Sequence, residues 1–188
     1  RDVNIYLNKL LKTKDHVYVV ASDTDSIYIK LGGMVDKIFK DKSDNKKIVK
    51  VLDKFCNEKL QTFINSSFTK LAKYVNAYDQ KMIMKREVIA NKGIWVAKKW
   101  YMLNVLDEEG VRLSEPKLKI MGIEAVKSST PQVCRGKIKE AIKTIMVKEQ
   151  SDLHKLIADF KKEFFSMSAE QISFPRSCNN LRKYKHSS

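Results

Sequence analysis

The sequence predicts an α+β fold, with a mainly antiparallel sheet and helices packed against it. Two apolar runs rich in β-branched residues flank a tight polar turn near residues 22–26, a pattern typical of a β-hairpin. Apolar residues then recur at helical spacing over a long segment and again near the end of the chain. Strand patterns lie between these two helical regions, and this order of elements favours the α+β class.

The first part of the chain is predicted to hold two helices and the hairpin. Apolar residues over 3–11 recur at helical spacing and predict a short opening helix. The hairpin follows, with strands near 16–21 and 26–31, and the pair Gly32-Gly33 ends it. A long amphipathic helix is predicted over about 46–76, because its apolar residues trace one face while the other face is polar.

Strand patterns dominate after the long helix. One strand is predicted over 82–89 and a second over 94–106, and a turn at 107–110 leads to further short strands. The Thr-Pro pair at 130–131 predicts the start of a helix, with Thr as N-cap and Pro as the first helical residue. Apolar spacing over 153–164 predicts one more helix.

Length and composition predict a globular protein of the cytoplasm. The 188 residues can bury one good core, and no apolar run approaches the ~20 residues that a membrane span needs. The three cysteines lie far apart and without metal-ligand spacing, which indicates a reducing compartment rather than a disulfide framework. Because Arg1 is not an initiator Met, we expect the chain to be part of a longer protein.

The formal net charge is +15, from 37 Lys and Arg against 22 Asp and Glu. Such an excess is typical of nucleic-acid-binding proteins, because backbone phosphates favour Lys and Arg through counterion release. A lysine-rich surface encoded by an A·T-rich genome would explain the same charge.

Two carboxylates lie at the predicted hairpin tip. Asp23 and Asp25 are separated by Thr24, and Mg²⁺ prefers such hard oxygen ligands together with substrate phosphates. The same residues also suit an ordinary turn, because Asp and Ser side chains hydrogen-bond to their own backbone there. The tip is therefore a candidate metal site that is not specific when it is considered alone.

Basic and aromatic residues alternate on the predicted strand over 94–106. Strand alternation would place Lys99 and Tyr101 on one face, and Lys98 and Trp100 on the other. A Lys next to a Tyr can reach DNA phosphates and minor-groove acceptors, although an exposed Lys pair beside core aromatics fits equally well.

Three further charged positions are candidates. Lys119 shares a strand face with Lys117, and Lys127 precedes the predicted helix start, where free N–H groups could bind a phosphate. Glu87 on its predicted strand could hold metal-bound water as an outer-shell carboxylate. The alternatives are an ordinary capped helix for Lys127 and the solvated side of a sheet for Glu87.

Together these segments resemble, in order and spacing, the family B DNA polymerases of tailed bacteriophages. Residues 22–26 are similar to motif C of that family, and 98–101 are similar to its Lys-Lys-x-Tyr motif. The segment from Glu115 to Pro131 resembles the part of the palm that leads to the thumb. The resemblance covers essentially the whole chain and implies a palm segment at 1–166 followed by the start of the thumb at 167–188.

The resemblance implies two-metal nucleotidyl transfer with Mg²⁺. Asp25 matches the carboxylate that binds the catalytic metals directly, Asp23 matches a neighbour with a more indirect role, and Glu87 matches an acidic palm residue near the metals. Primer-template contacts are implied for six residues: Thr24, Lys98, Lys99, Tyr101, Lys119 and Lys127.

Parts of the family pattern differ or are absent. Ala21 and Ser22 replace the usual aromatic residue and Gly before the motif C carboxylates, and Lys85 stands where the phage group tends to have an acid. Motif A, motif B and the exonuclease domain are not found in the sequence. We therefore expect no polymerisation by this chain alone. The implied partners are primer-template DNA, a deoxynucleoside triphosphate and the N-terminal part of the polymerase, and the implied location is the cytoplasm of an infected bacterial host.

Two alternative functions follow from the same residues. The first is a primer-template DNA-binding module without catalysis, which would depend on Lys99, Tyr101 and Lys127. The second is a sugar-nucleotide transferase with a metal site at Asp23 and Asp25, although the sequence shows no nucleotide-binding βαβ half.

Overall fold

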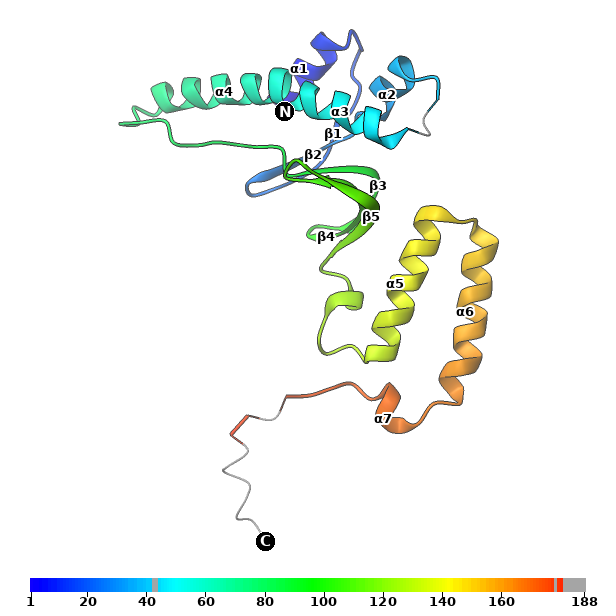
Figure 1. Ribbon diagram of the computed structural model, residues 1–188. Helices are drawn as coiled ribbons and strands as arrows, with labels where there is room; N and C mark the ends of the chain where they lie inside the picture. Colours follow the sequence, from blue (N-terminus) through cyan, green and yellow to red (C-terminus); the bar gives the residue numbers. More distant parts are fainter. Residues whose placement is uncertain (42–43, 178, 181–188) are drawn as a thin grey trace. The chain divides into compact units, whose positions relative to one another are not determined.

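The computed structural model describes residues 1–41, 44–177 and 179–180 (Figure 1). The chain divides into two compact units, the first from Arg1–Asn91 with Val105–Lys117 and the second from Lys92–Asn104 with the chain from Leu118 onward. Helices and antiparallel strands are both present, which confirms the predicted α+β class. Among the described residues, none of the helices combines the length and the apolar character needed to cross a membrane.

The opening helix and the hairpin form as predicted, and both lie in the first unit. Helix α1 spans Asp2–Leu10, and strands β1 (Val19–Asp23) and β2 (Ser26–Ile29) pair antiparallel. The glycines expected to end the hairpin instead begin helix α2 (Gly32–Ile38). The reason is local, because the Leu31 carbonyl already accepts the N–H groups of the first helical turn.

The predicted long helix is confirmed over almost its full length. It consists of α3 (Asn45–Phe55), a π-helical turn η1 (Cys56–Leu60) and α4 (Gln61–Tyr74), which follow one another without a break (Figure 1). The Asp44 side chain caps α3 by accepting the Lys47 N–H at 3.1 Å. A π turn inside a long helix adds one residue to a turn and is frequent at functional or strained positions.

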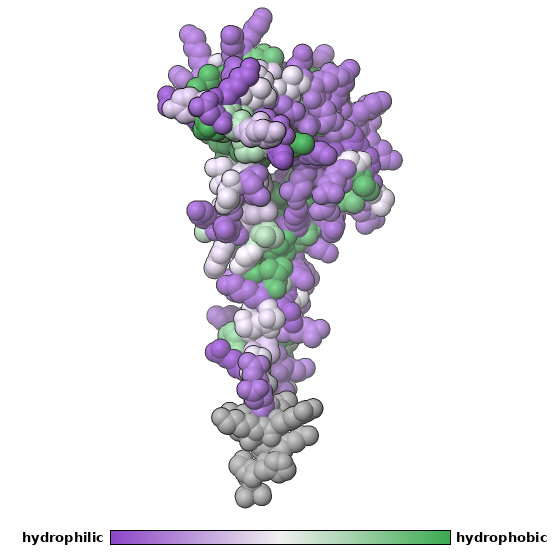
Figure 2. Space-filling model, turned by 90° about the vertical axis from the view of Figure 1, so that its left-hand side faces the viewer, coloured by the Kyte–Doolittle hydropathy of each residue, from purple (hydrophilic) through white to green (hydrophobic). Residues whose placement is uncertain are grey.

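Two clusters of apolar side chains form the core of the first unit. One joins α1, the residue before β1 and η1 through Leu7, Tyr18 and Leu60, and the other joins α3, β3 and β4 through Val49, Ile89 and Leu106. Each cluster connects segments far apart in sequence, so burial of these side chains fixes the hairpin against the long helix. Figure 2 shows that hydrophilic residues cover most of the face of the molecule that it presents.

The second sheet has the strand order β3-β4-β5. Two-residue connections join its neighbours, which makes them antiparallel. The turn after β4, at Glu109 and Gly110, has positive φ at both residues (52° and 91°), the conformation that suits a tight hairpin. The three strands are β3 (Val88–Ala97), β4 (Trp100–Glu108) and β5 (Val111–Met121).

The predicted strand over 82–89 is wrong except for its last two residues. Strand β3 begins only at Val88, and within the described residues no strand pairs with 82–87. An apolar segment forms a strand only where a neighbouring strand can pair with it and bury its side chains. Met82 and Ile83 are exposed instead.

The single strand predicted over 94–106 is also wrong. The chain turns back at Lys98 and Lys99, so the segment forms the end of β3 and most of β4. Turning back places Ile94 and Met102 in one apolar cluster, which a straight strand could not do.

Helices follow β5 in the second unit. Helix α5 (Gln132–Val147) begins one residue later than predicted, because Pro131 is its N-cap. Helices α5 and α6 lie side by side as an antiparallel pair (Figure 1), and Ile142 and Met146 of α5 pack on Met102 and Ala125. The helices are η2 (Glu124–Val126), α5 (Gln132–Val147), α6 (Gln150–Phe165) and α7 (Ala169–Ile172).

The predicted boundary between palm and thumb at residue 167 stays a prediction. Helix α7 lies in that last segment, and residues 178 and 181–188 of it fall outside the described residues.

Candidate functional site

The two hairpin carboxylates differ in their surroundings. Asp23 ends β1 and is half-buried, and its Oδ1 accepts the Thr24 N–H at 2.9 Å and the Thr24 hydroxyl at 3.4 Å. Asp25 lies in the turn itself and is exposed. Asp23 therefore helps to shape the turn, while the Asp25 carboxylate is presented to solvent.

The hairpin tip offers a partial ligand set for a metal ion. Among residues 1–41, 44–177 and 179–180, no three His, Cys, Asp or Glu side chains come together as metal ligands. Glu87 therefore does not complete a three-ligand site with the hairpin. Two carboxylates on one turn nevertheless fit Mg²⁺, which is usually held by one or two carboxylates plus water and substrate phosphates.

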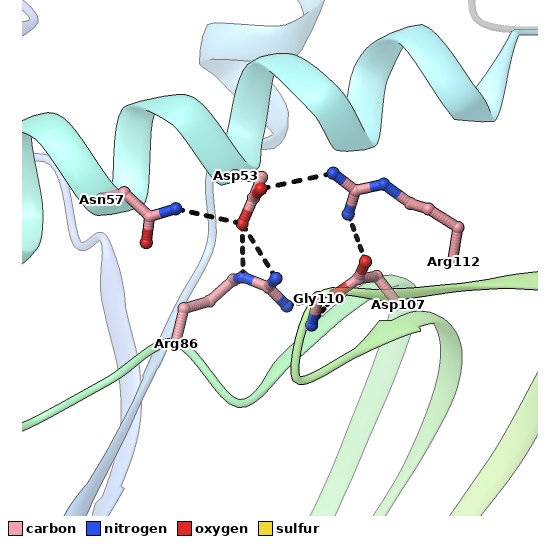
Figure 3. Close-up of polar contacts among 6 residues, drawn as sticks. All are labelled: Asp53, Asn57, Arg86, Asp107, Gly110 and Arg112. Carbon is pink, nitrogen blue, oxygen red and sulfur yellow. Dashed lines mark hydrogen bonds and ion pairs between the residues drawn. The ribbon is translucent and has the colours of Figure 1, made fainter.

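Arg86, the residue before Glu87 in the sequence, belongs to a network of ion pairs in the first unit (Figure 3). Arg86 donates from Nε to Asp53 Oδ1 at 2.8 Å and also pairs with Asp107, whose side chain is fully buried. Arg112 pairs with the same two carboxylates, at 3.3 Å from Nη2 to Asp53 Oδ2. The Gly110 N–H donates to Asp107 at 3.1 Å. The network thus ties the segment before β3 to helix α3 and to the turn after β4.

Glu87 is held in place through its backbone. It follows Arg86 directly, and its carbonyl accepts the Glu109 N–H at 2.6 Å. Its side chain is exposed, which matches both the outer-shell hypothesis and the solvated-face alternative. Sequence reasoning missed the network, although Asp107 at the end of a buried apolar run was a signal, since such a carboxylate needs a partner.

Cys56 in the π turn is close to the same network. Burial raises the pKa of its thiol to about 11, and the positive charge of Arg86 opposes that rise. The thiol is therefore protonated near neutral pH, which argues against a role as nucleophile.

In the second unit, the Lys-Lys pair occupies a turn rather than a strand. Lys98 and Lys99 connect β3 to β4, and Lys99 has a φ of 64°, in the left-handed region that residues other than Gly rarely adopt. The expected alternation of Lys99 and Tyr101 on one strand face is therefore wrong. Tyr101 is half-buried, and its ring centroid lies 6.3 Å from that of Trp95.

Lys127 lies between an acid and an aromatic ring. Its Nζ donates to Glu124 Oε1 at 2.7 Å and lies 4.6 Å from the centroid of the Trp100 ring. The hydrogen bond from Lys127 lowers the pKa of Glu124. Lys119 is half-buried near the end of β5. The candidate DNA-binding residues, apart from Thr24, thus belong to the second unit, and the acidic ones belong to the first.

Comparison with known proteins gives a clear relationship. Over 98% of its length, the chain is 39% identical to the DNA-directed DNA polymerase of Escherichia phage RB69 and 33% identical to that of Enterobacteria phage T4. The chain is homologous to a segment of the phage DNA polymerases. The match covers 21% and 22% of those two proteins, so the chain spans about a fifth of the length of these relatives. No family model matches the chain.

The predicted resemblance to phage DNA polymerases is thereby confirmed along essentially the whole chain. The roles of individual residues in a polymerase site remain predictions. They rest on the motif spacing and on the local geometry of each unit.

Proposed function

We propose that this chain supplies the metal-binding hairpin and the primer-template contacts of a family B DNA-directed DNA polymerase. The observation that supports this most strongly is the similarity to two phage DNA polymerases over 98% of the chain. The hairpin with two carboxylates at its tip agrees with a palm motif, and the net charge of +15 agrees with a DNA partner.

In this proposal Asp25 binds Mg²⁺ directly, Asp23 supports the turn, and Glu87 orders water in the outer shell. Two Mg²⁺ ions, when bound, would activate the primer hydroxyl and neutralise charge on the pyrophosphate. The exposure of Asp25 leaves its oxygens accessible to metal and substrate. Asp23 already accepts two hydrogen bonds from Thr24, which suits a more indirect role.

The basic residues of the second unit would bind the DNA backbone. Lys98 and Lys99 lie on an exposed turn, and Lys127 lies near that turn, over the Trp100 ring. Lysines in such positions contact phosphates and set the register of the duplex without reading its sequence. The remaining proposed contacts come from Thr24, Tyr101 and Lys119.

We further propose that the chain does not polymerise alone. It spans about a fifth of its relatives, and motifs A and B, which would supply a second metal-binding Asp and the nucleotide-binding finger helix, are not found in its sequence. A polypeptide with those motifs and a deoxynucleoside triphosphate would complete the site, in the cytoplasm of an infected bacterial host.

Primer extension tests this function. The chain is assayed with Mg²⁺ alone, and then mixed with a polypeptide that carries the motif A and finger regions. Activity only in the mixture, lost with Asp25→Ala and kept with Asp36→Ala, would support the proposal; Asp36 is an exposed carboxylate of α2 in the same unit. Extension by the chain alone would refute the proposed dependence on other segments.

The alternative is a primer-template binding module without catalysis. It is favoured by the net charge of +15 and by the exposed turn at Lys98 and Lys99, because contacts of lysines with a phosphate backbone need no metal ion. It predicts no extension in the mixture, and salt-sensitive DNA binding that survives Asp25→Ala but weakens with Lys99→Ala.

A further inference from the structure

The Trp100 ring is packed against Gly122, the residue that follows β5. A methyl group added to Gly122 would lie 2.6 Å from Trp100 Cδ1 and 2.6 Å from the Lys99 carbonyl oxygen. Gly122 also has a φ of 71°, in the region that favours glycine. Only a residue without a side chain therefore lets the turn at Lys98 and Lys99 approach the end of β5 this closely.

The same ring contacts Lys127. The Lys127 Nζ lies 4.6 Å from the ring centroid, within the range of a cation–π interaction. Trp100 is 39% exposed and the Lys127 side chain is 42% exposed, so the ammonium is accessible while it rests on the ring. The ring thus joins the Lys98-Lys99 turn to a lysine that is 28 positions further along the chain.

Lys127 has two partners of different kinds. Glu124 accepts a hydrogen bond from the ammonium at 2.7 Å, and the indole attracts it through the electrons of its face. Glu124 accepts one of the three N–H donors of the ammonium, and its negative charge would repel a DNA phosphate that approaches Lys127. The ring does not compete for those donors, and it can keep its contact after the exchange.

We propose that Trp100 is a positioning residue for DNA binding. Seated on Gly122, it keeps the Lys127 ammonium close to the Lys98-Lys99 turn while a backbone phosphate replaces Glu124 as the partner of Lys127. This inference rests on the proposed function, since it assumes that Lys99 and Lys127 contact primer-template DNA.

A double-mutant cycle tests the coupling between Trp100 and Lys127. Primer-template affinity is measured by fluorescence anisotropy over a series of salt concentrations, for the full chain and for Trp100→Leu, Lys127→Ala and the double variant. Loss of a cation–π contact predicts about two- to fivefold weaker binding for Trp100→Leu. The same change should have no further effect in the Lys127→Ala background, because the contact is already lost there. Lys127→Ala should also reduce the salt slope by about one.

Two conservative variants separate positioning from a general effect on folding. Trp100→Phe keeps an aromatic face and is expected to recover most of the affinity lost in Trp100→Leu. Glu124→Gln removes the competing charge and is expected to strengthen binding. Weaker binding by Glu124→Gln would show that Glu124, and not the ring, holds the lysine, and it would overturn the inference.

Other outcomes are equally decisive. If the Trp100→Leu effect is the same with and without Lys127, or if that variant binds like the parent, the inference fails while the proposed function stands. If the parent chain does not bind primer-template DNA at all, the proposed DNA-binding role fails, and the inference fails with it. Thermal unfolding followed by circular dichroism identifies any variant that is not folded, and in that case the Trp100→Phe and Glu124→Gln results decide.

Discussion

Replacing Asp107 with Asn would remove one negative charge from the centre of the network in Figure 3. The Asp107 side chain is completely buried and pairs with both Arg86 and Arg112. Asn has nearly the same shape and keeps an oxygen that can accept the Gly110 N–H. The substitution therefore changes charge with little change in packing, and the buried Arg86 loses one of its two counterions.

The magnitude follows from the burial of the remaining groups. Removing one partner of a buried ion pair costs about 3–5 kcal/mol, because the other charge stays buried without compensation. The Arg86 side chain is only 11% exposed, but Asp53 still lies 2.8 Å from its Nη2. Arg112 is 38% exposed and can turn to water. We therefore expect a loss near the lower end of that range, about 3 kcal/mol.

Urea unfolding followed by circular dichroism measures this loss. The matched control is Lys117→Met, which breaks an exposed pair between β5 and Glu108, the last residue of β4 (3.3 Å). Surface pairs contribute about 0–1 kcal/mol, so this variant should unfold close to the parent. If Asp107→Asn loses less than about 1 kcal/mol at an unchanged denaturant slope, the network does not hold the unit together as we argue.

Three further predictions concern single positions. Lys99→Gly should relieve about 1–2 kcal/mol of backbone strain, because Lys99 has a left-handed conformation. The greater entropy of the unfolded Gly variant offsets about half of that gain, so the melting temperature should rise slightly while DNA affinity falls. A lower melting temperature would contradict this prediction. Gly93→Ala should lower the free energy of unfolding in urea by about 1–3 kcal/mol, because the added methyl group would lie 2.8 Å from neighbouring side chains. An unchanged urea midpoint would refute that close packing. In a Cys134→Ser, Cys178→Ser background, iodoacetamide should modify folded Cys56 slowly at pH 9 and faster only towards pH 11. Any stability contributed by the neutral Cys56 thiol should be present below pH 9 and lost between about pH 9 and 11. Fast modification of the folded chain at pH 9 would contradict the burial of Cys56.

Features with a strong local signal were predictable from the sequence. The helix over 46–76 and the hairpin around Asp23 and Asp25 were expected within a few residues, because helical spacing and a polar turn between apolar runs leave few alternatives. The resemblance to phage polymerases was also available, because it depends on the order of short motifs along the chain.

Features that depend on tertiary contacts were not predictable. The turn at Lys98 and Lys99 has neither Gly nor Asn, and its close packing on Gly122 involves residues more than 20 positions apart. Similarly, Asp53 and Arg112 are separated by 59 positions, so no local pattern indicates that they pair. A periodic pattern predicts which face of a segment is buried, but it does not predict which other segment packs against that face.

Because of the π-helical turn at 56–60, the long helix depends on the number of residues in this segment as well as on their types. Deleting one residue there would restore a regular α-helix and rotate everything after it by about 100° relative to what precedes it. Asp53 before the turn pairs with Arg86, while Leu60, the last residue of the turn, and Ile64 after it are buried. A chain one residue shorter could keep the ion pair or the buried face, but not both, so homologues should tolerate substitutions in this turn far better than insertions or deletions.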